Sequence, residues 1–315
     1  MTRRGVVLGR RAAMLSLAAV ATRPAHAAEP SAKPFAMDEV APGLHVRLGV
    51  HEDATAANDD AIANIGFVVG QEAVAVIDPG GSRTDGARLR ASIRAVTALP
   101  IRYVILSHMH PDHVFGCEAF ADDDPAFIAH ANMLGALVAR GEYYRRELAD
   151  TLGLDEAGDY AKPTRLVEGL ATIDLGGRVL ELRAHGVAHT DNDLSVLDRQ
   201  TGTLWAADLL FVERIPALDG SLLGWQREMA VLAALPATRA VPGHGPTSVP
   251  WPAGAADQAR YLGTLTREIR GLIAHDGTIE MAVATVAAGE RGRWRLFDDY
   301  NGRNVTAAFK ELEWE

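Results

Sequence analysis

The stretch "SHMHPDHVFG", residues 107–116, carries three histidines and an aspartate within six positions: His108, His110, Asp112 and His113. Imidazole nitrogens suit zinc, and a carboxylate can bridge two ions or cap one. The preceding segment "RYVIL", residues 102–106, has the apolar character of a buried strand, and the Pro-Asp step interrupts regular structure. We therefore interpret the stretch as a metal-binding loop that follows a strand.

One such loop cannot complete two metal coordination spheres, so further ligands must come from later segments. His189 lies in "GVAHTDND", Asp208 follows an apolar run in "LWAADLL", and His244 is flanked by glycines in "VPGHGP". Each has an ordinary alternative, namely a surface histidine in a turn or an aspartate that caps a helix. Their order, with each residue near the end of a strand-like run or at a turn, makes the set a candidate metal site.

Hydrophobic patterning predicts two β-rich halves with helices attached to each. The expected strands are residues 43–48, 65–69, 73–77, 102–106, 172–174, 179–182, 194–197, 203–205 and 239–241. The expected helices are residues 84–99, 131–152, 225–235 and 258–275, followed by a mostly helical tail from residue 278. This pattern favours an α/β fold in which two sheets form a sandwich coated by helices, as one domain over residues 28–315.

The N-terminal residues 1–27 have the composition of a secretory signal peptide. Two arginine pairs precede an apolar run of ten residues, 12–21, which is too short to span a bilayer. The sequence Ala25-His26-Ala27 then provides a small-x-small cleavage pattern, and the paired arginines favour the twin-arginine route. A disordered basic tail is the alternative. We expect the protein to be exported to the periplasm.

The charge balance bears on the kind of partner. The chain has 31 basic and 41 acidic residues, and five of the basic ones lie in residues 1–27, so the mature chain has a formal charge of about −15. Such a surface disfavours nucleic acid and anionic membranes, and no other segment approaches membrane-spanning length. A small-molecule substrate is expected, and the sequence leaves protein partners undefined. The lone Cys117 excludes an intrachain disulfide and is expected to be a small packed residue.

The mature chain resembles the metallo-β-lactamase superfamily in "GFVVG…VAVIDPG", "SHMHPDH", "GVAHTDND", "LWAADLLF" and "VPGHGP". The resemblance implies a four-layer αββα sandwich and two zinc ions, with iron or another divalent metal as an alternative. It implies two groups of ligands: His108, His110 and His189 for one ion, Asp112, His113 and His244 for the other, and Asp208 as a bridge. Asp78, in "VIDPG", would orient a metal-binding loop.

The same resemblance implies a hydrolase in which a hydroxide shared by the two ions attacks an ester, thioester, amide or lactam. Asp112 would act catalytically by accepting a hydrogen bond from that hydroxide. One alternative is a β-lactamase, although lactamases with histidine-rich sites generally lack the bridging Asp208. Others are a mononuclear iron oxidoreductase similar to the persulfide dioxygenases, or a non-catalytic metal-binding accessory protein.

Two longer segments, residues 208–225 and the C-terminal 23 residues, resemble exported SoxH-like proteins. This group includes the quinoprotein relay system zinc metallohydrolases, which implies a link to quinoprotein metabolism and leaves the substrate undefined. Tyr143, Tyr144 and Trp225 are candidates to line the substrate cleft, because long connections after metal-bearing strands tend to form site walls. The alternative for each is ordinary packing.

Overall fold

The computed structural model describes residues 1–2 and 32–315. The predicted signal peptide, residues 1–27, therefore lies outside the described residues except for its first two positions. The chain divides into two units, Met1–Ser31 and Ala32–Glu315. Within the described residues, no helix combines the length and the apolar character needed to cross a membrane.

Within residues 32–315, the first sheet has seven strands in sequence order: β1 (Asp38–Ala41), β2 (Leu44–Arg47), β3 (Ile65–Val69), β4 (Val74–Ile77), β5 (Ile101–Leu106), β6 (Ala126–His130) and β7 (Arg165–Val167). Strands β1 to β4 pair antiparallel, so β3 and β4 form a hairpin. Strands β4 to β7 pair parallel, with Ile77 opposite Ile105. The residues that follow β4 and β5 therefore emerge at the same edge of the sheet.

In the same part of the chain, the second sheet has six strands: β8 (Leu170–Asp174), β9 (Val179–Ala184), β10 (Leu194–Asp198), β11 (Thr203–Phe211), β12 (Arg239–His244) and β13 (Val249–Pro250). They lie side by side in numerical order, and the β11–β12 pair is parallel while the others are antiparallel. The sequence predicted only residues 203–205 of β11. The strand extends to Phe211. Its pairing with β12 shifts register at Ala207, which has a positive φ of 47°.

The helices and 3-10 turns are α1 (Arg83–Val96), α2 (Pro111–Val114), η1 (Phe115–Asp123), α3 (Met133–Leu152), α4 (Leu222–Ala233), η2 (Ala253–Ala255), α5 (Ala256–Ile273), α6 (Ile279–Thr285), η3 (Ala288–Arg293) and α7 (Phe297–Leu312). The predicted helices are confirmed with ends shifted by a few residues. Helix α4 begins three residues earlier than expected, because the Ser221 side chain accepts a hydrogen bond from the Gly224 amide and caps it.

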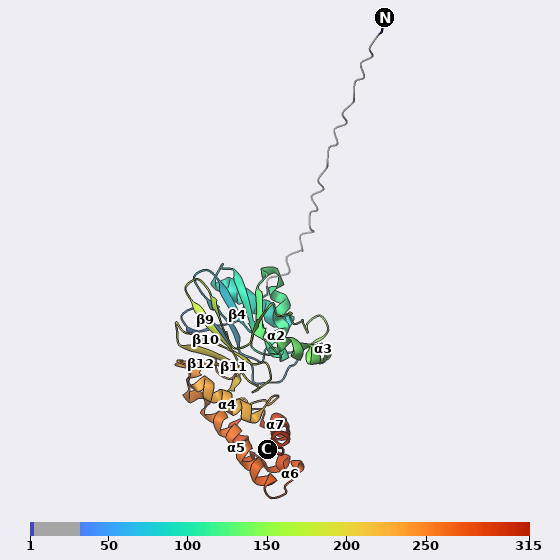
Figure 1. The fold of residues 1–315 in the computed structure, drawn as a ribbon, viewed down its shortest axis with the longest axis vertical. Helices are drawn as coiled ribbons and strands as arrows, with labels where there is room; N and C mark the ends of the chain where they lie inside the picture. Colours follow the sequence, from blue (N-terminus) through green and yellow to red (C-terminus); the bar gives the residue numbers. More distant parts are fainter. Residues whose placement is uncertain (3–31) are drawn as a thin grey trace. The chain divides into compact units, whose positions relative to one another are not determined.

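Three apolar clusters show the order of the layers. The first lies between the sheets and includes Ile105 of one sheet and Trp205 of the other. The second joins the outer face of the first sheet to α1 and α3, and the third joins the second sheet to α4, α5, α6 and α7. Figure 1 shows α4 beside β11 and β12 of the second sheet. The order is helix, sheet, sheet, helix, so the predicted αββα sandwich is confirmed.

Candidate metal centre

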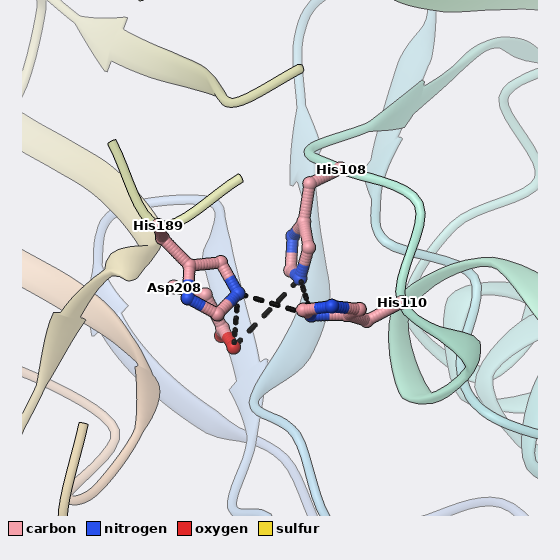
Figure 2. Close-up of side chains that lie close together, drawn as sticks. All are labelled: His108, His110, His189 and Asp208. Atoms are coloured by element: carbon pink, nitrogen blue, oxygen red, sulfur yellow. Dashed lines mark hydrogen bonds and ion pairs between the residues drawn. The ribbon is translucent and has the colours of Figure 1, made fainter. Parts of the chain in front are cut away.

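Three histidines from two loops point their ring nitrogens at one another. His108 and His110 follow β5, and His189 lies in the loop between β9 and β10. The Nδ1 atom of His110 is 3.0 Å from Nε2 of His108 and 3.0 Å from Nε2 of His189 (Figure 2). Ligand nitrogens of one tetrahedral zinc lie about 3.3 Å apart, given Zn–N bonds of about 2.0 Å. The spacing therefore suits three ligands of one ion.

A second group lies next to the first and consists of Asp112, His113 and His244. The Nε2 atom of His244 is 3.3 Å from a carboxylate oxygen of Asp112. Asp208 connects the groups, because its Oδ1 is 3.0 Å from His113 Nε2 and its Oδ2 is 3.5 Å from His189 Nε2. All seven residues predicted as ligands are thus brought together in two adjacent sets, with Asp208 between them.

Two buried atoms of this cluster lack a hydrogen-bond partner within the described part of the chain. They are Nε2 of His113 and Oδ1 of Asp208, which face each other. A buried polar atom without a partner costs about 1–3 kcal/mol, so each such atom in a folded protein needs an explanation. A divalent cation accounts for both atoms at once, because it accepts the imidazole lone pair and neutralises the carboxylate. The donor set therefore fits a metal ion.

The outward-facing nitrogens of the ligand histidines are held by acceptors. A ring N–H on Nδ1 satisfies each contact and leaves the Nε2 lone pair directed inward, which is the arrangement that orients metal ligands. The contacts are His113 to Asp78 at 2.8 Å, His189 to the Ala217 carbonyl at 2.6 Å, and His244 to the Ile62 carbonyl at 3.1 Å. His110 is reversed, since its Nδ1 faces inward and its Nε2 lies 3.1 Å from Asp219.

Asp78 occupies the position that the sequence predicted for a residue orienting the loop. Its two oxygens accept hydrogen bonds from the backbone amide and hydroxyl of Ser107, at 2.8 and 2.9 Å, while Oδ2 also contacts His113. Asp78 is fully buried and has a φ of 57°, a conformation that aspartate tolerates better than most residues. The parallel pairing of β4 with β5 places it beside the histidine loop.

Electrostatics favour metal-binding protonation states at His108, His189 and Asp208, but not at His113. Nearby carboxylates outweigh burial and raise the pKa of His113 well above its ordinary value, so a metal ion must displace a proton there. Burial, followed by the nearby His113, lowers the pKa of His108 well below its ordinary value, and burial lowers the pKa of His189 to about 4. Burial acts to raise the pKa of Asp208, but His244 and His113 outweigh it and hold that pKa well below the usual range. Neutral imidazole and ionised carboxylate are the forms that bind a metal.

The Asp208 carboxylate depends on an unusual backbone around it. Ala207 has a positive φ, which is uncommon for a residue other than glycine, and this bend directs the strand into the centre. A Cβ atom on Gly243 of the neighbouring strand would overlap Oδ1 of Asp208. The glycines of "VPGHGP" are therefore explained in part by this close approach.

Asn64, which no sequence pattern singled out, connects the His244 segment to the first sheet. Asn64 is fully buried, and its amide nitrogen donates to the carbonyls of Pro242 and Gly245 at 2.9 and 3.1 Å. Its backbone N–H donates to the Gly243 carbonyl at 2.6 Å. An asparagine before an apolar strand usually indicates a turn, so the sequence offers no specific signal for this role.

The three residues predicted to line a cleft have different locations. Trp225 is fully buried, donates its Nε1–H to the Leu209 carbonyl, and packs 5.3 Å from His189. Trp225 therefore lines no cleft and supports His189 from within the core, which is the packing alternative expected from the sequence. Tyr144 is half-buried with its ring 6.1 Å from that of His110, and Tyr143 is exposed beside it.

Cys117 is buried in the cluster between the first sheet and its helices, as expected of a packed residue. Burial raises the pKa of its thiol to about 12, so the thiol stays protonated and unreactive at neutral pH.

Known proteins share this fold. The family model of the metallo-beta-lactamase superfamily matches residues 58–244, more than half of the chain and all seven candidate ligands. A metallo-beta-lactamase from Pontibacter korlensis superposes with a TM-score of 0.58 and 18% identity over 73% of this chain and 99% of that one. The sec-alkylsulfatase Pisa1 from Pseudomonas sp. superposes with a TM-score of 0.66 and 19% identity over 88% of this chain and 50% of that one.

A curated protein, the putative transcription factor avaE from Aspergillus versicolor, is 28% identical over 108 residues, or 34% of this chain. The matched part spans about a third of that protein, 32% of its length. The structural likenesses establish the fold, and the family model covers the segment that carries every candidate ligand. On this evidence, the chain belongs to the metallo-beta-lactamase superfamily.

Proposed function

We propose that the protein is an exported binuclear zinc hydrolase that cleaves an acyl bond in an ester, thioester, amide or lactam. The observation that carries the proposal is the position of Asp208. Its two oxygens contact histidines of both groups, at 3.0 Å from His113 and 3.5 Å from His189, as a carboxylate shared by two ions requires. Ions held there would lower the pKa of a water toward about 7 and polarise the bond under attack.

The chain's own residues supply the rest of the proposed mechanism. Asp112 lies in the second group, and a small part of its side chain reaches solvent. Burial opposes ionisation of Asp112, but the neighbouring His113 and His244 lower its pKa overall, so the carboxylate is ionised. An ionised Asp112 can accept a hydrogen bond from the attacking water and orient it toward the acyl carbon.

Buried aromatic side chains support the ligands on the core side. Phe211 stacks on His244 with ring centres 5.0 Å apart, and Trp225 packs edge-on against His189. These rings exclude water from one side of the centre, which strengthens electrostatic interactions within it. The attacking water and the substrate must then enter from the opposite, more exposed side.

The test is metal analysis of the purified protein combined with a panel of lactam, thioester, ester and lactone substrates. We expect about two zinc ions per chain, as in other two-metal hydrolases, and turnover of at least one acyl class. Asp208→Ala should lower the zinc stoichiometry and turnover together. One iron per chain with oxygen uptake on a persulfide would instead identify an oxygenase, and full metal content without turnover would identify an accessory protein.

Two further parts of the proposal concern context. Export rests on the arginine pairs and cleavage pattern of residues 1–27, and the link to quinoprotein metabolism rests on the SoxH-like resemblance. Cell fractionation of the tagged full-length chain tests the first, with recovery in the periplasm expected. A growth defect of a deletion strain on alcohols oxidised by quinoproteins tests the second.

A further inference from the structure

The candidate centre opens to solvent on the side of His110. The His110 side chain is 17% exposed, whereas those of His108, His113, His189 and His244 are at most 4% exposed. A substrate must therefore approach past His110 and the residues around it. Helix α3 provides two of these residues, Arg140 and Tyr144, which are four positions apart and so project from the same face of the helix.

Arg140 is held at this opening by a contact that leaves most of its donors free. Its Nη1 atom is 2.7 Å from Oδ2 of Asp219, and the same oxygen contacts Nε2 of His110 at 3.1 Å. Within the described residues, Asp219 is its only acidic partner. A guanidinium has five N–H donors, so donors remain for a further anion, and the Arg140 side chain is 39% exposed.

Tyr144 completes this surface. Its ring lies 5.8 Å from the guanidinium of Arg140 and packs edge-on against His110. Its hydroxyl forms no hydrogen bond to any described residue. A tyrosine hydroxyl is protonated at neutral pH, so it can donate a hydrogen bond to an anion. An arginine and a tyrosine thus present unused donors beside the centre.

We propose that Arg140 and Tyr144 bind a carboxylate carried by the substrate, so that the preferred substrate is an acyl compound with a second, anionic end. This inference rests on the proposed hydrolase function for the reaction itself. The planar fork of arginine matches a carboxylate, and the donors of Arg140 that Asp219 leaves free, together with the Tyr144 hydroxyl, can hydrogen-bond its oxygens. A doubly charged phosphate would call for more cations than this surface offers.

The first test compares two esters of one phenol, the hemiglutarate and the valerate, which differ in having a terminal carboxylate or a terminal methyl group. We expect the wild-type protein to favour the hemiglutarate by about tenfold or more in kcat/KM, the gain typical of a charge-assisted hydrogen bond. Arg140→Ala should abolish this preference, mainly through KM, and Arg140→Lys should retain part of it because the charge remains.

The matched control is Arg146→Ala on the same helix. Arg146 is exposed and pairs with Glu142, away from the centre, so this variant should keep the wild-type preference. An unchanged hemiglutarate preference in Arg140→Ala, or no preference in the wild-type protein, would overturn the proposal. Circular dichroism and zinc content matching those of the wild-type protein verify that the Arg140→Ala variant is folded.

The second test does not depend on turnover. Calorimetry of the zinc-loaded protein compares glutarate with valerate, each of which has one carboxylate able to meet the metal, while only glutarate has another. Tighter binding of glutarate that disappears in Arg140→Ala supports the carboxylate site even if no ester is cleaved, in which case the hydrolase proposal alone fails. Equal binding of the two acids overturns the carboxylate site while leaving hydrolysis to be judged on the ester panel.

Discussion

The two ligand groups differ in what holds them in place. In the second group, His113 is supported by Asp78, which is itself fully buried and bonded to the Ser107 backbone. In the first group, His110 is supported by Asp219, a partly exposed side chain that also pairs with Arg140. A buried carboxylate is fixed by its surroundings, whereas an exposed one exchanges its partners with water and salt.

This difference suggests that the two ligand groups have different roles in the centre. The second group and its supports form a rigid framework built by the sheet edges. The first group has one ligand, His110, whose support is part of the solvent-exposed opening. Perturbations of the buried supports should therefore affect metal binding more than perturbations of the exposed ones.

The largest effect is expected at Asp112, the residue proposed to orient the attacking water. Asp112→Ala should lower kcat by about 10²-fold or more, the typical contribution of a positioned acid or base. Metal content should fall less, because His113 and His244 remain. Stopped-flow kinetics with metal analysis on the same sample provide the measurement, and a variant that lost both ions yet stayed active would refute the assignment.

A pH effect of similar size is expected at His189 in the metal-free protein. Its pKa is about 4 when folded and about 6.5 when unfolded, so folding must release a proton between these values. Its contribution is fully favourable above pH 6.5 and is lost as the pH falls to about 4, a change of about 3 kcal/mol. Urea unfolding of wild type and His189→Gln in chelator should show this difference, and parallel pH profiles would exclude it.

A smaller effect is expected at Asp78, the buried residue that supports His113. Asp78→Asn presents a weaker acceptor to the His113 ring and should weaken binding of one of the two zinc ions by about 10- to 100-fold. Competition with a chromogenic chelator measures the two affinities separately. If both ions were retained at wild-type affinity, Asp78 would have no influence on the metal.

The smallest effect is expected at Asp219, the partly exposed residue that supports His110. Asp219→Asn should weaken metal binding by less than about tenfold, because solvent can replace the exposed acceptor of His110. The same chelator competition measures zinc affinity in this variant. The ratio of the affinity losses in Asp78→Asn and Asp219→Asn then shows how much more the buried support contributes than the exposed one. A larger loss at Asp219 than at Asp78 would reverse our interpretation of the two groups.

Much of the centre could be predicted from the sequence, because metal ligands belong to few residue types and occur at characteristic spacings. His108 and His110 were recognised from their loop, and His244 from its flanking glycines. The supports were harder to predict. Asn64 and Asp219 are ordinary polar residues in loops, and their roles arise only because the folded chain brings them to a carbonyl or an imidazole.

The strand assignments illustrate the same limit. An apolar run of alternating or continuous character identifies β5 and β11, but the positive φ of Ala207 and the length of β11 have no local signal. Trp225 was a candidate for the cleft wall, with ordinary packing as the alternative, and it lies in the core because its helix packs its apolar face against the second sheet.

The sequence by itself determined the fold class, the ligand types and their order along the chain, because hydrophobic periodicity and coordination chemistry are local properties. Only the tertiary structure decided which nitrogen of each histidine faces inward, which acceptor holds the other, and which side of the centre is open. These features depend on contacts between residues far apart in the chain, such as Asp78 with His113 and Asp219 with Arg140. No local pattern encodes them, because they result from the packing of two sheets and their helices.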